Sequence, residues 1–262
     1  MKRFIGLLAF IGVFILAGCF DTAEELTIND DGSGTLVNSI DMGKMISALS
    51  AMGGEGDEKM KEAEKMKVDT TILMKSMKDS ISGLSDAEKK LLEKGTVHLV
   101  MDIKDEKFSV TFSMPFSKLA DIPDVKNVLK RSNGKIMEKM MNKVMPEGKN
   151  KDDEDVQSND KDGTPDISGY FQTTYEKNKI TRKVDKEKFA KAEDDQSLKS
   201  LKEMGQMGMP LNLKTVINLP KPAKKANGKG ITLSDDKKKI TIEGTLDDFF
   251  DDPSKFEYEI EY

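Results

Sequence analysis

The chain has 262 residues and a formal net charge of −5, and 34% of its residues are charged whereas only 6% are aromatic. This length allows one large domain or two small ones, and the acidic balance argues against nucleic acid as a partner, because such binding depends on clustered positive charge. With one histidine and one cysteine, the chain has too few ligands for a zinc site and no pair for a disulfide, so packing and sheet pairing must stabilise it.

The N-terminus has the pattern of an export signal that ends in a lipidation site. The basic pair Lys2-Arg3 precedes an apolar run at residues 4–16, and the run closes in Leu16-Ala17-Gly18-Cys19. The apolar run is too short for a permanent membrane-spanning helix, and small residues before a cysteine are typical of a lipobox. We therefore predict that residues 1–18 are a signal peptide and that Cys19 becomes the lipidated first residue of the mature protein.

This signal resembles that of the uncharacterised secreted lipoproteins of Gram-negative bacteria, and the segment 26–34 fits the same resemblance more loosely. The resemblance implies acyl chains such as palmitate on Cys19, and two or three chains anchor a protein stably to a membrane. In that class, an aspartate directly after the cysteine favours retention at the inner membrane. Phe20 stands at this position, so the resemblance implies the outer membrane as the location.

After the signal, the pattern predicts an N-terminal α+β region over residues 19–145. The segments Leu26–Ile28 and Thr35–Ile40 flank a glycine-rich turn and predict a hairpin. A strand is expected at 69–74, and Ser85-Asp86-Ala87-Glu88 forms a capping box that begins a short helix.

The next hairpin has the clearest pattern in the chain. Apolar and polar residues alternate from Val97 to Ile103 and from Phe108 to Met114, with Asp105-Glu106 as the turn. This alternation indicates an antiparallel sheet with one buried and one wet face. The apolar spacing after Ile122 then predicts a helix that is interrupted near Asn133-Gly134 and continues as a methionine-rich segment.

An acidic segment at residues 146–167 has almost no apolar residue, and we predict that it is a linker or long loop. A C-terminal β-rich region is predicted for 168–262, with a hairpin over 170–184 and one helix over 186–204. Four further strands are expected in this region, at 213–219, 230–234, 239–246 and 255–262.

With about eleven strands and no regular βαβ order, the predicted fold is α+β. It is mainly antiparallel sheet built from hairpins, with helices packed on one face. The sequence leaves open whether the two halves share one sheet or form two domains.

The acidic segment contains a candidate metal site. Residues 160–166 resemble the D-x-D-G-x-x-D core of calcium-binding acidic repeats. Alternate carboxylates on a tight turn can converge on one hard cation, which makes Asp160, Asp162 and Asp166 the expected Ca2+ ligands. A solvated acidic linker is the alternative interpretation.

Catalytic patterns are sparse. His98 is the only histidine and falls on the polar face of its predicted strand. The segments Ser132-x-x-Lys135 and Ser234-x-x-Lys237 have a Ser-Lys spacing that this serine- and lysine-rich chain produces by chance. We expect no enzymatic activity, and Ca2+ is the only candidate cofactor.

The chain contains 17 methionines, and many of them fall on predicted helices, as at residues 137–141. Flexible thioethers either fill gaps in a core that is poor in aromatics or line an adaptable groove for lipid or a partner helix. We predict a non-enzymatic, membrane-anchored envelope lipoprotein that acts by binding a lipid or protein partner that the sequence does not identify. The alternative is a periplasmic lipid or lipoprotein carrier with a half-barrel and an apolar cavity of several hundred Å3.

Overall fold

The structure is a computed structural model that describes residues 20–44, 67–76, 81, 84–144, 167–206 and 210–262. Within these ranges, one sheet has eight strands and a second sheet has four. The predicted α+β fold with large antiparallel sheets is confirmed. No helix of the described part is long and apolar enough to cross a membrane.

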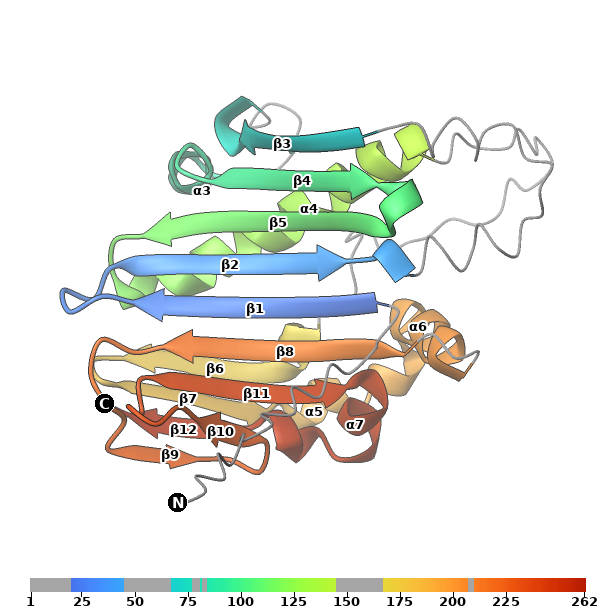
Figure 1. Ribbon diagram of the computed structural model, residues 1–262. Helices are drawn as coiled ribbons and strands as arrows, with labels where there is room; N and C mark the ends of the chain where they lie inside the picture. The colour runs from blue at the N-terminus through green and yellow to red at the C-terminus, as the bar shows by residue number, and fades with distance from the viewer. Residues whose placement is uncertain (1–19, 45–66, 77–80, 82–83, 145–166, 207–209) are drawn as a thin grey trace, which may run out of the picture.

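The eight-stranded sheet combines strands from both halves of the chain (Figure 1). Its spatial order is β10 (Ile231–Leu233), β11 (Lys239–Thr245), β8 (Leu211–Asn218), β1 (Phe20–Ile28), β2 (Gly34–Asp41), β5 (Lys107–Phe116), β4 (Thr96–Asp102) and β3 (Lys67–Leu73). Neighbouring strands are antiparallel except β1 and β8, which are parallel with Phe20 beside Leu211. The two halves of the chain therefore share one sheet.

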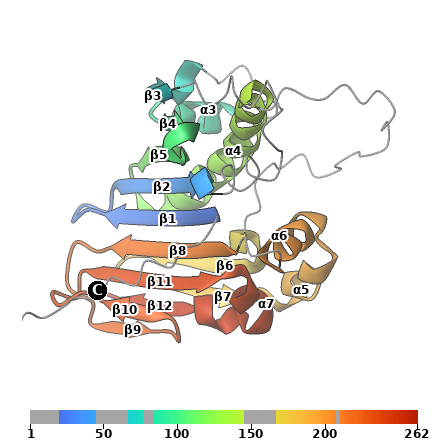
Figure 2. The same cartoon turned by 45° about the vertical axis from the view of Figure 1, so that its right-hand side comes forward.

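The four-stranded sheet lies behind the β8–β11 side of the larger sheet, as the two views together show (Figures 1 and 2). Its order is β6 (Phe171–Glu176), β7 (Lys179–Val184), β12 (Tyr258–Glu261) and β9 (Lys225–Asn227). Helix α4 (Ile122–Val144) lies behind the β1–β5 side of the larger sheet. One face of the larger sheet is thus covered by α4 and the smaller sheet together.

The remaining helices are short. They are α3 (Asp86–Leu92), α5 (Lys186–Phe189), α6 (Gln196–Gln206) and α7 (Leu246–Asp251), with 3-10 turns η2 (Ile103–Asp105), η3 (Leu119–Asp121), η4 (Ile167–Tyr170), η5 (Ala192–Asp194) and η6 (Pro253–Phe256). The capping box predicted for α3 is confirmed, because the Ser85 hydroxyl accepts from the Glu88 N–H and the Glu88 carboxylate accepts from the Ser85 N–H. Helices α5, α6 and α7 lie at the end of the sheets where β1 and β8 begin (Figures 1 and 2).

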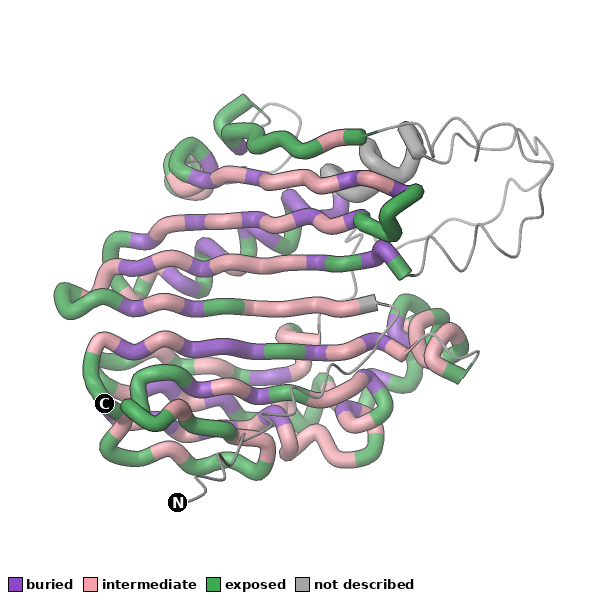
Figure 3. The backbone as a smooth tube through the Cα atoms, in the orientation of Figure 1, coloured by how far each residue is buried: buried purple, intermediate pink, exposed green. Residues whose placement is uncertain are grey.

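The core lies between the larger sheet and the elements behind it, and buried residues alternate with less buried ones along the strands (Figure 3). On β5, Phe108, Val110 and Phe112 are at most 1% exposed. They belong to the same core cluster as the apolar face of α4, which includes Val125 and Leu129 at 0%. The predicted hairpin of β4 and β5 is confirmed, with η2 and a left-handed Glu106 forming its turn.

Two helix predictions were wrong in detail. Helix α4 is not interrupted at Asn133-Gly134, because packing of its buried face offsets the cost of about 1 kcal/mol for a helical glycine. The segment 186–204 is not one helix. The side chains of Asp185 and Asp195 accept from backbone N–H groups and begin α5 and α6 separately.

Two short elements were not predicted. Strand β9 has three residues and therefore no readable alternation. Helix α7 begins at a capping box formed by Thr245 and Asp248, a pattern that the sequence contains within a predicted strand. Similarly, the strand predicted at 255–262 is shorter, because Pro253 begins η6 and β12 starts only at Tyr258.

Candidate functional site

The residues predicted to carry lipid and calcium lie outside the described part of the chain. These are Cys19, Asp160, Asp162 and Asp166, and the acidic segment around the last three is also outside it except for its last residue, Ile167. Both assignments therefore stay predictions. Among the residues that are described, no group of three or more His, Cys, Asp or Glu side chains is placed to hold a metal ion.

The weak catalytic candidates lie in separate parts of the molecule. His98 Nε2 lies 2.8 Å from Asp69 Oδ1 on the outer strands β4 and β3, where both side chains are exposed. The Ser132 hydroxyl donates to the Val128 carbonyl in α4 at 2.7 Å. The Ser234 hydroxyl donates to the Asp236 carboxylate at 2.6 Å. The structure brings none of these side chains to a common site.

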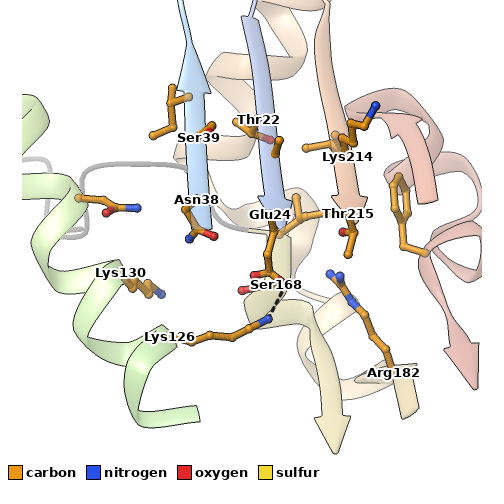
Figure 4. Close-up of a pocket in the computed structure, with 16 residues that line it drawn as sticks. Thr22, Glu24, Asn38, Ser39, Lys126, Lys130, Ser168, Arg182, Lys214 and Thr215 are labelled. Atoms are coloured by element: carbon orange, nitrogen blue, oxygen red, sulfur yellow. Dashed lines mark hydrogen bonds and ion pairs between the residues drawn. The ribbon is translucent and has the colours of Figure 1, made fainter. Parts of the chain in front are cut away.

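A cavity of about 120 Å3 lies between the two sheets. Strands β1, β2 and β8 form one wall, α4 forms a second, and β7 with η4 and η6 closes the third (Figure 4). Its charged lining residues are Glu24, Lys126, Lys130, Arg182 and Lys214, and its apolar ones include Ile40, Ile167, Leu213 and Phe256. The cavity thus combines an apolar surface with an excess of positive charge.

The wall formed by the larger sheet carries a row of polar side chains at core-facing positions. Glu24 on β1 is in register with Asn38 on β2 and with Thr215 on β8. Two residues further along β1, Leu26 is in register with Leu36 and is buried with it. The polar row therefore occupies positions at which the alternation elsewhere places apolar residues, and it creates a polar patch inside the fold.

Glu24 is neutralised by a lysine from α4. The Lys126 ammonium donates to Glu24 Oε1 at 2.7 Å, and each of the two side chains is 20% exposed. Burial disfavours the charged form of Lys126, but the facing Glu24 carboxylate, together with Tyr175 and Tyr258, outweighs burial and raises the pKa of the ammonium above its ordinary value. Both the Lys126 ammonium and the Glu24 carboxylate are therefore charged, and together they have no net charge.

Arg182 enters the cavity from β7 without such a partner. Arg182 is 5% exposed, and its guanidinium lies 4.1 Å from the centre of the Phe171 ring. The Nε atom of Arg182 has no hydrogen-bond partner among the described residues. Within the same part of the chain, no carboxylate lies within ion-pair distance of it. Burying a charge in this way is costly unless another group compensates it.

Two asparagine side-chain oxygens are also buried without a hydrogen-bond partner among the described residues. Asn38 Oδ1 on β2 and Asn133 Oδ1 on α4 are buried and accept no hydrogen bond from any described residue. Together with Arg182 Nε, they make up all of the buried side-chain nitrogen and oxygen atoms without partners in the described part. All three residues line the cavity.

Comparisons with protein-family models, with curated proteins and with solved structures found no match to this chain. The function of the cavity is therefore inferred from its own groups, which are an arginine guanidinium, two amide oxygens, hydroxyls and an apolar wall. Groups of this kind bind a small polar molecule by hydrogen bonds and exclude water from it.

This site was not predicted, although part of its pattern is visible in the sequence. Arg182 is two residues from Ile180 on the same strand, so it falls on the core-facing side of the predicted hairpin. Glu24 likewise alternates in phase with Leu26 and Ile28. A charged residue in phase with core residues is the signal that could have been used.

Proposed function

We propose that the mature protein is a lipid-anchored, non-enzymatic protein of the cell envelope that binds a small ligand in the cavity between its two sheets. The observation that carries the proposal is that the three buried atoms without partners in the described part all belong to residues of this cavity. Folded proteins satisfy nearly all such atoms, because each unsatisfied one costs about 1–3 kcal/mol. An occupant that supplies the missing partners removes this cost.

The position of β1 supports anchoring close to the bilayer. This strand begins at Phe20, the residue directly after the predicted lipidation site Cys19, and it lies between β8 and β2 in the larger sheet. Acyl chains on Cys19 would hold the end of the sheet at which β1 begins near the membrane. We therefore expect the end that carries α6 and α7 to face the bilayer (Figure 1).

A lipid carrier is supported less well by the described residues. Enclosing acyl chains needs an apolar cavity of several hundred Å3, whereas the cavity between the sheets measures about 120 Å3 and has charged walls. The methionines at 0–4% exposure, which are Met42, Met74, Met101 and Met114, fill the core of the described part. These four fill gaps in the core, whereas the methionines at residues 137–141 lie outside the part whose side chains are described.

Metabolic labelling with a palmitate analogue tests the anchor. The full chain expressed in a Gram-negative host should carry the label in its membrane fraction, and Cys19→Ser should carry none and keep its signal peptide. Label that persists on Cys19→Ser contradicts the proposed anchor.

Native mass spectrometry tests the binding. The mature-length chain with Cys19→Ser, isolated without detergent, should carry a small-molecule adduct that denaturation releases. Thr215→Leu narrows the cavity and should lose the adduct. Thr241→Leu should keep it, because Thr241 is in register with Val216, the residue next to Thr215, and therefore lies on the opposite face of the same sheet. A phospholipid or fatty-acid adduct would favour the carrier, and an adduct that both variants keep would contradict binding in the cavity.

A further inference from the structure

The class of ligand can be argued from the charges of the cavity. Lys126 is paired with Glu24, and Lys214 is paired with Glu243 at 2.5 Å and points away from the cavity (Figure 4). Arg182 is a buried lining cation for which the described residues provide no carboxylate within ion-pair distance. Because a buried positive charge is stabilised by an opposite charge, the cavity favours an anion as its ligand.

The neighbours of Arg182 do not supply that negative charge themselves. Tyr258 is its partner in register on β12, and burial raises the pKa of the Tyr258 phenol above its ordinary value. Burial likewise raises the pKa of Tyr175. Both phenols are therefore neutral near pH 7 and leave the guanidinium charge uncompensated.

The geometry favours a planar anion. Phe171 stacks on the face of the guanidinium and leaves its edge toward the polar row of β1 and β8, as Figure 4 shows for Glu24 and Thr215. The Nε–H, which lies in the plane of the guanidinium, has no hydrogen-bond partner among the described residues. An arginine edge presents parallel N–H donors that match the two oxygens of a carboxylate.

The opposite side of the cavity requires a hydrogen-bond donor. Asn38 Oδ1 and Asn133 Oδ1 are acceptors without donors among the described residues, so a ligand that carries an O–H or N–H group can donate to them. An ammonium group is disfavoured beside Arg182, Lys126 and Lys130, and a hydroxyl is the smallest neutral group that donates a hydrogen bond. The size also fits a short ligand, because a cavity of about 150 Å3 holds one benzene molecule, about six non-hydrogen atoms.

We infer that the cavity binds a short hydroxycarboxylate, with the carboxylate on the Arg182 guanidinium and the hydroxyl donating to an asparagine oxygen. This inference rests on the proposed function, since it names the ligand class of the same cavity. Lactate has the required groups and size. Propionate lacks only the hydroxyl, and alanine replaces it with an ammonium group.

Isothermal titration of the mature-length Cys19→Ser chain tests the inference with lactate, propionate, alanine and inorganic phosphate as probes. Lactate should bind at one saturable site and more tightly than the other three. Arg182→Met should weaken lactate binding at least about tenfold, because it removes charge-assisted hydrogen bonds. Lys67→Met makes the same change of charge on β3, outside the cavity lining, and it should bind lactate as the parent chain does.

Folding of the variant is checked by thermal unfolding. Arg182→Met replaces a buried charge by an apolar side chain of similar length, so its midpoint should stay the same or rise. If Arg182→Met does not fold, Arg182→Lys is tested instead. It keeps the positive charge but removes the planar guanidinium with its parallel N–H donors, and it should show the same loss of binding.

Three results would overturn the inference. They are phosphate, alanine or propionate binding at least as tightly as lactate, unchanged lactate binding in a folded Arg182 variant, and no saturable binding of lactate. An adduct of another small polar class in native mass spectra would overturn the ligand class while leaving the proposed function intact. A chain that carries no adduct and binds none of the probes would contradict both.

Discussion

At the scale of single residues, the polar row beside the cavity depends on one ion pair. Glu24 lies between Asn38 and Thr215 in a part of the sheet that is otherwise apolar. Its carboxylate is stable there because Lys126 reaches it from α4. The same ion pair therefore holds α4 against β1, the strand that carries the central residue of the polar row beside the cavity.

Glu24→Gln should lower the free energy of unfolding by about 3 kcal/mol, because it leaves the mostly buried Lys126 ammonium without its partner. Urea unfolding measures the change. Glu243→Gln is the control, because its pair with Lys214 is 47% exposed on both sides and should contribute less than about 1 kcal/mol. Equal losses in the two variants would contradict the structural role of the Glu24 pair.

Glu259 on β12 gives a second residue-scale prediction, for the dependence of stability on pH. Hydrogen bonds from Lys225 at 2.9 Å and Lys179 at 3.1 Å lower the pKa of its carboxyl to about 2 from an ordinary value of 4.5. A lowered pKa stabilises the fold above pH 4.5, and this stabilisation is lost as the pH falls toward 2.

Urea unfolding at several pH values between 6 and 2 checks this prediction. Glu259→Gln should be less stable than the parent chain at pH 6, and the difference should shrink as the pH falls, because the parent chain loses the contribution that the variant lacks. A difference that stays constant over this range would show that Glu259 does not keep its lowered pKa.

At the scale of elements, α7 connects the two sheets through an aromatic cluster. Phe249 is fully buried, and its ring centre lies 5.3–6.1 Å from those of four other aromatic side chains, Tyr170, Phe171, Phe189 and Phe250. Phe171 is also the ring on which Arg182 stacks. The cluster therefore supports the position of the arginine as well as the packing of α5 and α7.

Phe249→Ala should lower the free energy of unfolding by about 3–5 kcal/mol, because it removes a buried ring and leaves a cavity. Phe250→Ala should lower the free energy of unfolding by less than this, since Phe250 is only partly buried. Chemical unfolding of both variants measures the two values. A Phe249→Ala loss no larger than that of Phe250→Ala would contradict the central place of Phe249 in the cluster.

Local patterns predicted the elements that depend on neighbouring residues. The hairpins β1–β2, β4–β5 and β6–β7 follow from alternation and turn residues, and Asn178 indeed adopts a left-handed conformation in the last of them. The site was less accessible to sequence reasoning. Lys126 and Glu24 are 102 residues apart, and nothing in either segment indicates that they meet.

At the scale of the whole molecule, the parallel pairing of β1 with β8 joins the two halves. Thr22 and Asn212, which hydrogen-bond across this pair, are separated by 190 residues. Such long-range pairing leaves no local trace in a sequence, which is why the sequence could not decide between one sheet and two domains. The cavity lies beside this seam, so its shape depends on both halves.

Because the halves share a sheet and a core, the described fold should unfold in one cooperative transition. Circular dichroism and tyrosine fluorescence should give the same midpoint, and the calorimetric and van't Hoff enthalpies should agree. Two separate transitions would indicate that the halves fold independently and would contradict the shared core.

The central claim is that Arg182 meets a ligand inside the cavity, and the NMR signal of its own Nε–H tests this most directly. Arg131 and Arg182 are the only arginines in residues 19–262, so the mature-length Cys19→Ser chain offers an internal control. Arg131 is 43% exposed and pairs with Glu88 outside the cavity. On titration with lactate, the Arg182 signal should shift and saturate while the Arg131 signal stays in place. If neither signal moves, or both move together without saturation, the cavity does not bind the ligand through Arg182.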